Sequence, residues 1–260
     1  MLLTVDIGNT HTVLGVFKGD QLIADWRMAS SAQRTADESW LTIKSFCTDA
    51  GIRPSYIKGV GISSVVPNLT DIFESIARKY LNVNPVTISA SLDLGIKVHY
   101  KDPSAVGADR LCNAIAGFKK FGGPLIIIDF GTATTFDVVS KDGDYLGGVI
   151  ALGLESAASE LHRKAAKLPK IDLQFPDQVI ATETVKSMQA GIMFGAVDAV
   201  EGIVRRIKSE LEGKAKVIAT GGLSTTVARH TDVIEACELS LVLEGIRLIY
   251  ERVEGKSRKE

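Results

Sequence analysis

The stretch that decides the fold is DFGTATTFDVV, residues 129–139, because it repeats DIGNTHTVLGV, residues 6–16. Each copy opens with an aspartate at the end of an apolar run, followed by an apolar residue and a glycine. An offset of 123 residues aligns Asp6 with Asp129, Gly8 with Gly131, Asn9 with Thr132 and Thr12 with Thr135. Two unrelated hairpins that share these residues by chance are the alternative to a true repeat.

The segments around the two copies follow one plan. Strand-like runs flank Gly19-Asp20 in the first half and Asp142-Gly143 in the second, which predicts antiparallel hairpins. Apolar periodicity predicts helices over residues 37–51, 68–81, 184–213 and 238–253, and further strands over 57–67 and 215–224. Gly51 is a candidate helix stop and Asn68 a candidate N-cap. We therefore predict two related α/β domains, residues 1–120 and 121–260.

The composition argues against several classes of protein. The chain has 260 residues, a net charge of -1 and 45% hydrophobic residues, which is typical of a globular protein and not of a basic nucleic-acid surface. The three cysteines form no C-x-x-C pair and the four histidines show no metal-ligand spacing. No signal peptide and no membrane-spanning run are apparent, so we expect a cytoplasmic protein without a membrane or nucleic-acid partner.

The repeated turn carries groups that suit phosphate chemistry. Gly8 and Gly131 allow close approach of a ligand, and backbone N–H groups in such a turn form an anion-binding concavity. Threonine hydroxyls can donate to phosphate oxygens, and the carboxylates of Asp6 and Asp129 suit Mg²⁺ or a similar cation. A plain tight hairpin with aspartate as a turn former is the structural alternative. The sequence contains neither a P-loop motif nor G-x-G-x-x-G opening a helix.

Taken together, DIGNTHT, DFGTATT and the later TGG resemble the phosphate-binding elements of the actin-like ATPase and sugar kinase superfamily. A longer ordered set of motifs resembles type III pantothenate kinase from Met1 to about Tyr250. These motifs are DIGNTHTVLGVF, KDPSAVGADRL, IIIDFGTATTFDVV, AAKLPKIDL, GIMFGAVDAVEGIVRRIK, VIATGGLS and LEGIRLIY. The resemblance implies two duplicated ribonuclease H-like (actin-like ATPase) domains with mixed sheets flanked by helices.

The resemblance also implies the reaction and its cofactors. The family transfers the γ-phosphate of ATP to the primary hydroxyl of pantothenate, the first step towards coenzyme A, with Mg²⁺ and a monovalent cation, K⁺ or NH₄⁺. Asp6 matches the Mg²⁺-associated carboxylate, Asp129 the ligand of the monovalent cation and Thr132 a second ATP contact. The first phosphate loop matches Asp6, Ile7, Gly8, Asn9, Thr10, His11, Thr12 and Val13.

The motif GADR, residues 107–110, is the most specific part of the resemblance. Asp109 matches the general base that accepts the proton of the substrate hydroxyl, and Arg110 suits a carboxylate partner. An acidic residue that favours a helix N-terminus is the structural alternative for Asp109. The substrate-contacting positions of the family match Tyr100, Gly107, Ala108, Asp109, Arg110 and Thr184. Members are homodimers that share the pantothenate pocket across the interface, to which Thr184 would contribute.

The chain departs from the family pattern at two places. Leu152 stands where a proline is usual, and Glu183 adds negative charge near the expected anionic substrate. The glycines at 191, 195 and 202 suit close helix packing, for example at a dimer interface, or a broken helix. Two other functions stay open: a superfamily kinase acting on a different small alcohol, and a non-enzymatic regulatory role.

Overall fold

The computed structural model describes residues 1–211 and 213–257. Packing divides the chain into two compact units. Unit 1 comprises Met1–Ala116 and the segment from Ser240 onward, and unit 2 comprises Gly117–Leu239. The chain passes from unit 1 into unit 2 within helix α3 (Ala108–Phe121). The sequence-based boundary at residue 120 stays a prediction, but the last helix packs in unit 1 and not with the second half.

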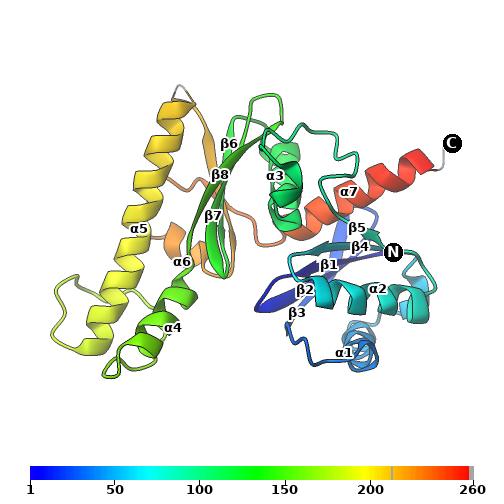
Figure 1. Cartoon of the computed structure of the whole chain (residues 1–260), viewed down its shortest axis with the longest axis horizontal. Coiled ribbons are helices and arrows are strands. Elements are labelled where there is room, and N and C mark those ends of the chain that lie inside the picture. The colour runs from blue at the N-terminus through cyan, green and yellow to red at the C-terminus, as the bar shows by residue number, and fades with distance from the viewer. Residues whose placement is uncertain (212, 258–260) are drawn as a thin grey trace. The chain divides into compact units, whose positions relative to one another are not determined.

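Unit 1 is built on a five-stranded mixed sheet in the order β3-β2-β1-β4-β5 (Figure 1). The strands are β1 (Leu2–Ile7), β2 (His11–Lys18), β3 (Gln21–Ala29), β4 (Gly59–Ser64) and β5 (Val86–Thr87). β1, β2 and β3 form the predicted antiparallel meander, and β4 and β5 join in parallel. Gly19 makes the β2–β3 turn with a positive φ of 63°, which suits a residue without Cβ.

Two helices cover one face of this sheet. Leu3, Val5 and Ile7 alternate along β1 onto that face and pack in one apolar core with α1 (Ala36–Asp49) and α2 (Pro67–Leu81). Thr35 and Glu38 form a capping box at the start of α1. The expectation that Asn68 caps α2 is wrong: Val66 is the N-cap and Pro67 follows at the first helical position. Proline suits that position because its missing N–H would be unpaired there.

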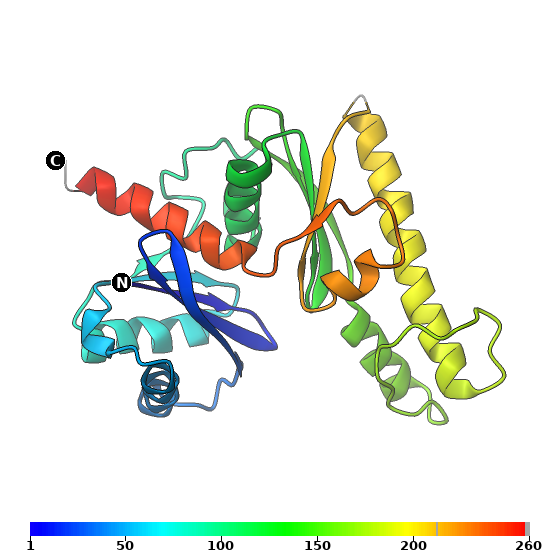
Figure 2. The ribbon, with the colours of Figure 1, turned by 180° about the vertical axis from the view of Figure 1, so that it is seen from behind.

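The last helix, α7 (Leu241–Ser257), packs against β1, β2 and β4 of unit 1 (Figure 2). Glycines make this approach possible. A Cβ at Gly61 would lie 2.6 Å from a methyl carbon of Ile246, and one at Gly15 would lie 2.9 Å from Leu243. Because Gly15 also faces Thr4, α7 lies on the sheet face opposite α1 and α2.

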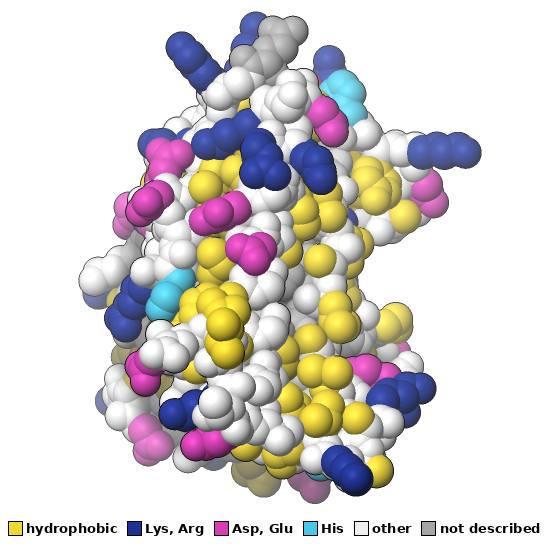
Figure 3. Space-filling model, turned by 90° about the vertical axis from the view of Figure 1, so that its left-hand side faces the viewer, with side chains coloured by type: hydrophobic (Ala, Val, Ile, Leu, Met, Phe, Trp, Pro, Cys, Tyr) yellow, Lys and Arg dark blue, Asp and Glu magenta, His cyan; other side chains and the backbone are white. Residues whose placement is uncertain are grey.

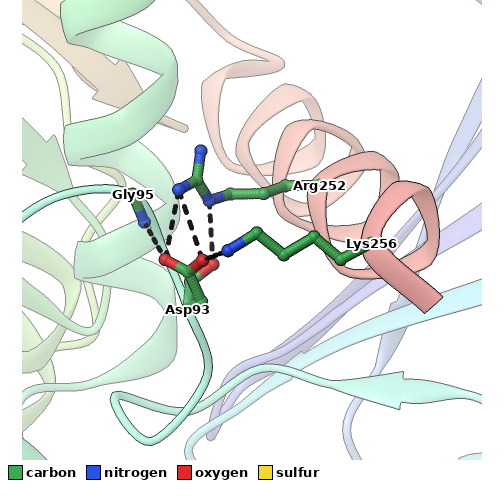
Figure 4. Close-up of polar contacts among 4 residues, drawn as sticks. All are labelled: Asp93, Gly95, Arg252 and Lys256. Carbon is green, nitrogen blue, oxygen red and sulfur yellow. Dashed lines mark hydrogen bonds and ion pairs between the residues drawn. The ribbon is translucent and has the colours of Figure 1, made fainter. Parts of the chain in front are cut away.

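An ion cluster fixes the other end of α7. Arg252 and Lys256 of α7 both contact the carboxylate of Asp93, which also accepts a hydrogen bond from the backbone of Gly95 (Figure 4). These side chains are about half exposed, so each ion pair contributes little stability by itself. Short 3₁₀ turns at Pro54–Tyr56 and Pro103–Ala105 complete unit 1.

Unit 2 repeats the sheet with the order β10-β9-β6-β7-β8. The strands are β6 (Leu125–Phe130), β7 (Ala133–Val139), β8 (Tyr145–Leu152), β9 (Lys216–Gly221) and β10 (Ala236–Cys237). β6, β7 and β8 form the second antiparallel meander, and β9 and β10 join in parallel. Two mixed sheets flanked by helices confirm the predicted fold class.

Three helices of unit 2 are α4 (Leu154–Lys164), α5 (Thr184–Glu210) and α6 (Ser224–Ala228). Residues of all three pack with Ile126, Ile128 and Phe130 of β6 in one apolar core. α5 runs unbroken for 27 residues, so the alternative of a helix broken at its glycines is wrong.

The alignment of the two halves changes its offset at the turn after the first strand of each. β1 and β2 are joined by three residues, whereas β6 and β7 are joined by two. Thr12 pairs with Ile7, and the residue paired with Phe130 is Thr134. Thr12 therefore corresponds to Thr134 and not to Thr135, as the constant offset had aligned it.

Candidate functional site

Asp6 lies at the carboxyl end of β1, beside the end of the parallel strand β4. Its backbone pairs in register with Ser63, and the buried Ser63 hydroxyl donates a 2.8 Å hydrogen bond to Asp6 Oδ1. Side-chain alternation places Asp6 on the α7 face of the sheet, opposite the face of Val5 and Ile7. The ends of parallel strands are a usual place for ligands in α/β sheets.

The turn after β1 is closed by its own backbone and held by Ser30. Gly8 N–H donates to the His11 carbonyl at 3.0 Å. Ser30 donates its N–H to the Thr10 carbonyl at 2.9 Å and its hydroxyl to the Gly8 carbonyl at 2.6 Å. These bonds fix two carbonyl groups of the turn.

The predicted phosphate-loop residues differ in exposure. Asn9, Thr10 and His11 are exposed, Asp6, Gly8 and Val13 are half-buried, and Ile7 and Thr12 are buried. The Thr12 hydroxyl lies 2.9 Å from the Ser30 hydroxyl, so it is already engaged inside the protein. The exposed part of the turn is therefore Asn9–His11.

Helix α3 begins at Ala108, which places Asp109 in its first turn. The Arg110 N–H donates a 2.8 Å hydrogen bond to Asp109 Oδ1, which leaves Oδ2 to accept from other groups. A Cβ at Gly107 would lie 2.4 Å from Asp109 Oδ1, so this carboxylate position requires glycine at 107. Ala108 and Arg110 are both buried, whereas Asp109 itself is half-buried.

Burial raises the pKa of Asp109 above its ordinary value. The backbone hydrogen bond from Arg110 and the positive charge of Arg110 lower it, but the loss of hydration outweighs them. A carboxylate with a raised pKa is a stronger base than one in water, which suits proton abstraction.

Cys112, one turn after Asp109, is completely buried in the same region. Burial, and then the negative charges of Asp6 and Asp109, raise the pKa of its thiol well above the ordinary value, while a hydrogen bond with Ser63 lowers it. The thiol therefore stays protonated at neutral pH.

In unit 2, Asp129 ends β6 as Asp6 ends β1, and it pairs in register with Thr220 of β9. Glycines lie close to its carboxylate. A Cβ at Gly221, whose φ is +88°, would lie 2.6 Å from Asp129 Oδ1, and one at Gly131 would lie 3.8 Å away. Glycine at 221 therefore lets the backbone approach this half-buried carboxylate.

The turn at Gly131-Thr132 lies against the start of α4. The Ser156 hydroxyl donates a 2.7 Å hydrogen bond to the Thr132 carbonyl. A Cβ at Gly153, the N-cap of α4, would lie 2.3 Å from that same carbonyl oxygen. Thr132 itself is exposed. This glycine therefore allows the helix N-terminus, with its unpaired N–H groups, to lie beside the turn.

The described residues of unit 2 line a cavity and a groove. A cavity of about 660 Å³ is bounded by α4, the segment 170–173 and Leu223, and its polar lining includes Glu155, Ser159, His162 and Lys170. An apolar groove of about 360 Å³ lies between β8, α4 and α5, and Leu152 and Gly195 are part of its lining.

The two remaining predicted residues lie away from regular strands. Tyr100 is 37% exposed in the irregular segment before the 3₁₀ turn at 103–105, so it is not a strand-edge residue. Thr184 is the exposed first residue of α5, and the N-cap is Glu183, which makes no side-chain capping bond. Thr184 is therefore not the N-cap of α5.

Within residues 1–211 and 213–257, no three His, Cys, Asp or Glu side chains gather around a common position for a metal ion. Mg²⁺ in kinases is typically held by one or two carboxylates with substrate phosphates and water, and a single carboxylate such as Asp6 fits that pattern. Asp129 likewise supplies one carboxylate at a strand end, a hard oxygen ligand that suits a cation.

Sequence reasoning missed Ser63, Ser30 and Cys112. The contact of Ser63 with Asp6 depends on the parallel pairing of β1 and β4, which the sequence does not reveal by itself.

In the part of the chain that the structure covers, no helix has both the length and the apolar character of a membrane span.

Comparisons with known proteins bear on the whole chain. A family model described as type III pantothenate kinase matches residues 2–206. The type III pantothenate kinase of Citrifermentans bemidjiense is 46% identical over 252 residues, which cover 97% of this chain and 99% of that protein. The type III pantothenate kinase of Geobacter sulfurreducens is 45% identical over the same length and the same shares of the two chains.

Solved structures resemble the fold at low sequence identity. Component A of (R)-2-hydroxyglutaryl-CoA dehydratase from Acidaminococcus fermentans has a TM-score of 0.58 and 13% identity, and the match covers 99% of this chain and 98% of that one. A ROK hexokinase from Thermus thermophilus has a TM-score of 0.54 and 13% identity, covering 98% and 99%. These likenesses show the fold alone.

Proposed function

The chain belongs to the type III pantothenate kinase family, and we propose that it uses the described residues to transfer the γ-phosphate of ATP to pantothenate, the first step of coenzyme A synthesis. The observation that carries the residue assignment is Asp109. Its carboxylate has a raised pKa, one oxygen held by the Arg110 N–H and the other left to accept a proton.

The proposed mechanism assigns one task to each group. Asp109 Oδ2 accepts the proton of the primary hydroxyl of pantothenate as that oxygen attacks the γ-phosphorus of ATP, and ADP leaves. Arg110 lies beside the base with a permanent positive charge and suits the substrate carboxylate. Tyr100, Gly107 and Ala108 complete the substrate contacts on unit 1.

The ATP contacts follow the two repeated turns. The exposed backbone of Asn9, Thr10 and His11 binds phosphate oxygens, Gly8 allows their close approach, and Thr132 provides a further contact from the second turn. Thr12 contributes through its backbone, since its hydroxyl is engaged with Ser30. The cavity of about 660 Å³ beside α4 and Leu223 has the volume of a nucleoside site.

Asp6 would hold Mg²⁺, and Asp129 would hold a monovalent cation, K⁺ or NH₄⁺. When bound, these ions neutralise the phosphate charge that grows during transfer. The protein's part is to fix the two carboxylates at the ends of β1 and β6, through the backbone pairing of each strand and the Ser63 hydrogen bond to Asp6.

The active form is proposed to be a homodimer that shares the pantothenate pocket, with Thr184 supplied by the second subunit. Support comes from the apolar groove and from the glycines at 191, 195 and 202 of α5. A Cβ built at any of these three glycines would have no neighbouring atom within 4 Å. Seen from the α5 side, hydrophobic side chains run across this face (Figure 3). Small residues on an exposed helix face suit close packing of a second copy.

A coupled ADP-release assay with Mg²⁺ and K⁺ tests the reaction. We expect ADP release that depends on pantothenate and falls when K⁺ is replaced by a large organic cation. A folded protein without pantothenate-dependent release would contradict the proposal, and turnover with a different small alcohol instead would favour another kinase of the superfamily.

The dimer has a test with a matched control. Leu152→Asp places a charge on the groove, at a residue that is 65% exposed, and should shift the protein to a monomer in sedimentation velocity. Leu41→Asp, at a leucine of α1 that is 64% exposed, should leave the oligomeric state unchanged. Equal sedimentation of the wild type and both variants would remove this face as the interface.

A further inference from the structure

Ser63 carries a buried hydroxyl that contacts Asp6, the carboxylate proposed to hold Mg²⁺. It is fully buried on β4, in backbone register with Asp6, and donates a 2.8 Å hydrogen bond to Asp6 Oδ1. The hydrogen bond thus joins the ends of two neighbouring parallel strands, β1 and β4, inside the protein.

We propose that Ser63 is a positioning residue that holds Asp6 in the orientation required for Mg²⁺·ATP. The inference rests on the proposed role of Asp6. A carboxylate can rotate about its last bonds, and a buried donor on Oδ1 restricts that rotation and so fixes the orientation of the whole group.

The fold gives this arrangement a built-in comparison. In unit 2, Asp129 pairs with Thr220 in the same parallel register as Asp6 with Ser63. Each unit thus has a hydroxyl residue paired in register with its strand-end aspartate. In unit 2 this residue is the buried Thr220, so a threonine can be accommodated at such a position. Ser63→Thr is therefore a conservative variant that keeps the donor.

The test measures Mg²⁺ dependence rather than activity alone. Binding of a non-hydrolysable ATP analogue is followed by calorimetry with Mg²⁺ and with EDTA, and turnover is titrated with Mg²⁺. Ser63→Ala should weaken Mg²⁺-assisted binding about tenfold, leave binding in EDTA unchanged, and raise the Mg²⁺ concentration for half-maximal rate about tenfold. Ser63→Thr should stay within about twofold of the wild type in both titrations.

Ser64→Ala is the matched control on the same strand. The Ser64 hydroxyl bonds to Val66 and Thr70 at the start of α2, so its loss should lower the melting temperature without changing either Mg²⁺ titration. Should Ser63→Ala fail to fold, Ser63→Cys replaces it, because cysteine has a similar volume and a weaker donor. Its Mg²⁺-assisted binding and its Mg²⁺ concentration for half-maximal rate should lie between those of the wild type and those expected for Ser63→Ala.

The outcomes separate the two proposals. A wild type that binds Mg²⁺·nucleotide but releases no ADP with pantothenate contradicts the proposed function, while the binding titrations still decide the role of Ser63. Equal Mg²⁺ dependence in the wild type and Ser63→Ala overturns the inference about Ser63 alone. A Ser63→Thr variant as weak as Ser63→Ala overturns it as well, because packing and not the hydroxyl would then be the cause.

Discussion

Replacing Asp109 by asparagine should separate catalysis from stability. The asparagine Oδ1 can still accept from the Arg110 N–H, so the backbone contact at 2.8 Å is retained. The variant cannot accept a proton at neutral pH. General-base catalysis typically contributes about 10²–10⁴-fold to a rate, so kcat should fall by that factor, which corresponds to about 3–5 kcal/mol of activation free energy.

Whereas kcat should fall in Asp109→Asn, the free energy of unfolding of this variant should exceed that of the wild type at neutral pH. Two effects compete at Asp109: burial penalises the ionised form, and the neighbouring charge and N–H of Arg110 favour it. Because the pKa is raised, burial wins, and the folded state binds the proton more tightly than the unfolded state. This contribution is fully present below the unfolded pKa and is lost as pH rises through the folded pKa.

Urea unfolding of wild type and Asp109→Asn between about pH 3 and pH 8 measures this difference. The two proteins should have similar stability at the acid end, where the wild-type carboxyl is protonated and resembles the amide. Asp109→Asn should gain relative to the wild type as pH rises. Turnover within tenfold of the wild type would remove Asp109 as the base, and a relative loss of stability at high pH would refute the dominance of burial.

Three further changes test the surroundings of the site and the docking of the last helix. Tyr145→Phe removes a buried 2.8 Å hydrogen bond to Asp137 and should cost about 1–3 kcal/mol in urea unfolding; no change would show that this carboxylate does not need the phenol. Gly221→Ala places a Cβ 2.6 Å from Asp129 Oδ1 at a positive φ, so it should raise the K⁺ concentration for half-maximal rate and lower the melting temperature, and an unchanged K⁺ titration would separate Asp129 from the cation. Asp93→Asn weakens the ion cluster with α7 and should cost less than about 1 kcal/mol, because the pairs are exposed; a larger loss by thermal unfolding would make α7 docking depend on charge.

Much of the fold could be predicted because its signals are local. The hairpins followed from alternating strands around Gly19 and Gly143, both of which have positive φ. The position of α7 on the sheet could not be predicted from the sequence. Glycine is needed at 59 and 61 because Tyr250 and Ile246 of α7 pack directly against these positions, and that contact is visible only in the structure. The register after the first turn was missed because one additional residue in a loop shifts the alignment by one.

The candidate site residues could be named from the sequence, but the contacts that support them could not. Asp6, Asp109 and Asp129 stand out because each has a motif around it, and the structure places two of them at matching strand ends and the third in the first turn of α3. Ser30 and Ser63 have no motif of their own. They act through hydrogen bonds between segments that are distant in sequence, and those depend on the strand order.

The packing of α7 on the sheet of unit 1 constrains the order in which the two units can fold during synthesis. All of unit 2 lies between the strands of unit 1 and the helix that covers their second face. While unit 2 is being synthesised, the face of Gly15, Gly59 and Gly61 is uncovered, since the residues of α7 have not yet been made. Unit 2 is contiguous in sequence and can complete its own core first. The half of the protein that is made first is therefore the half that finishes folding last.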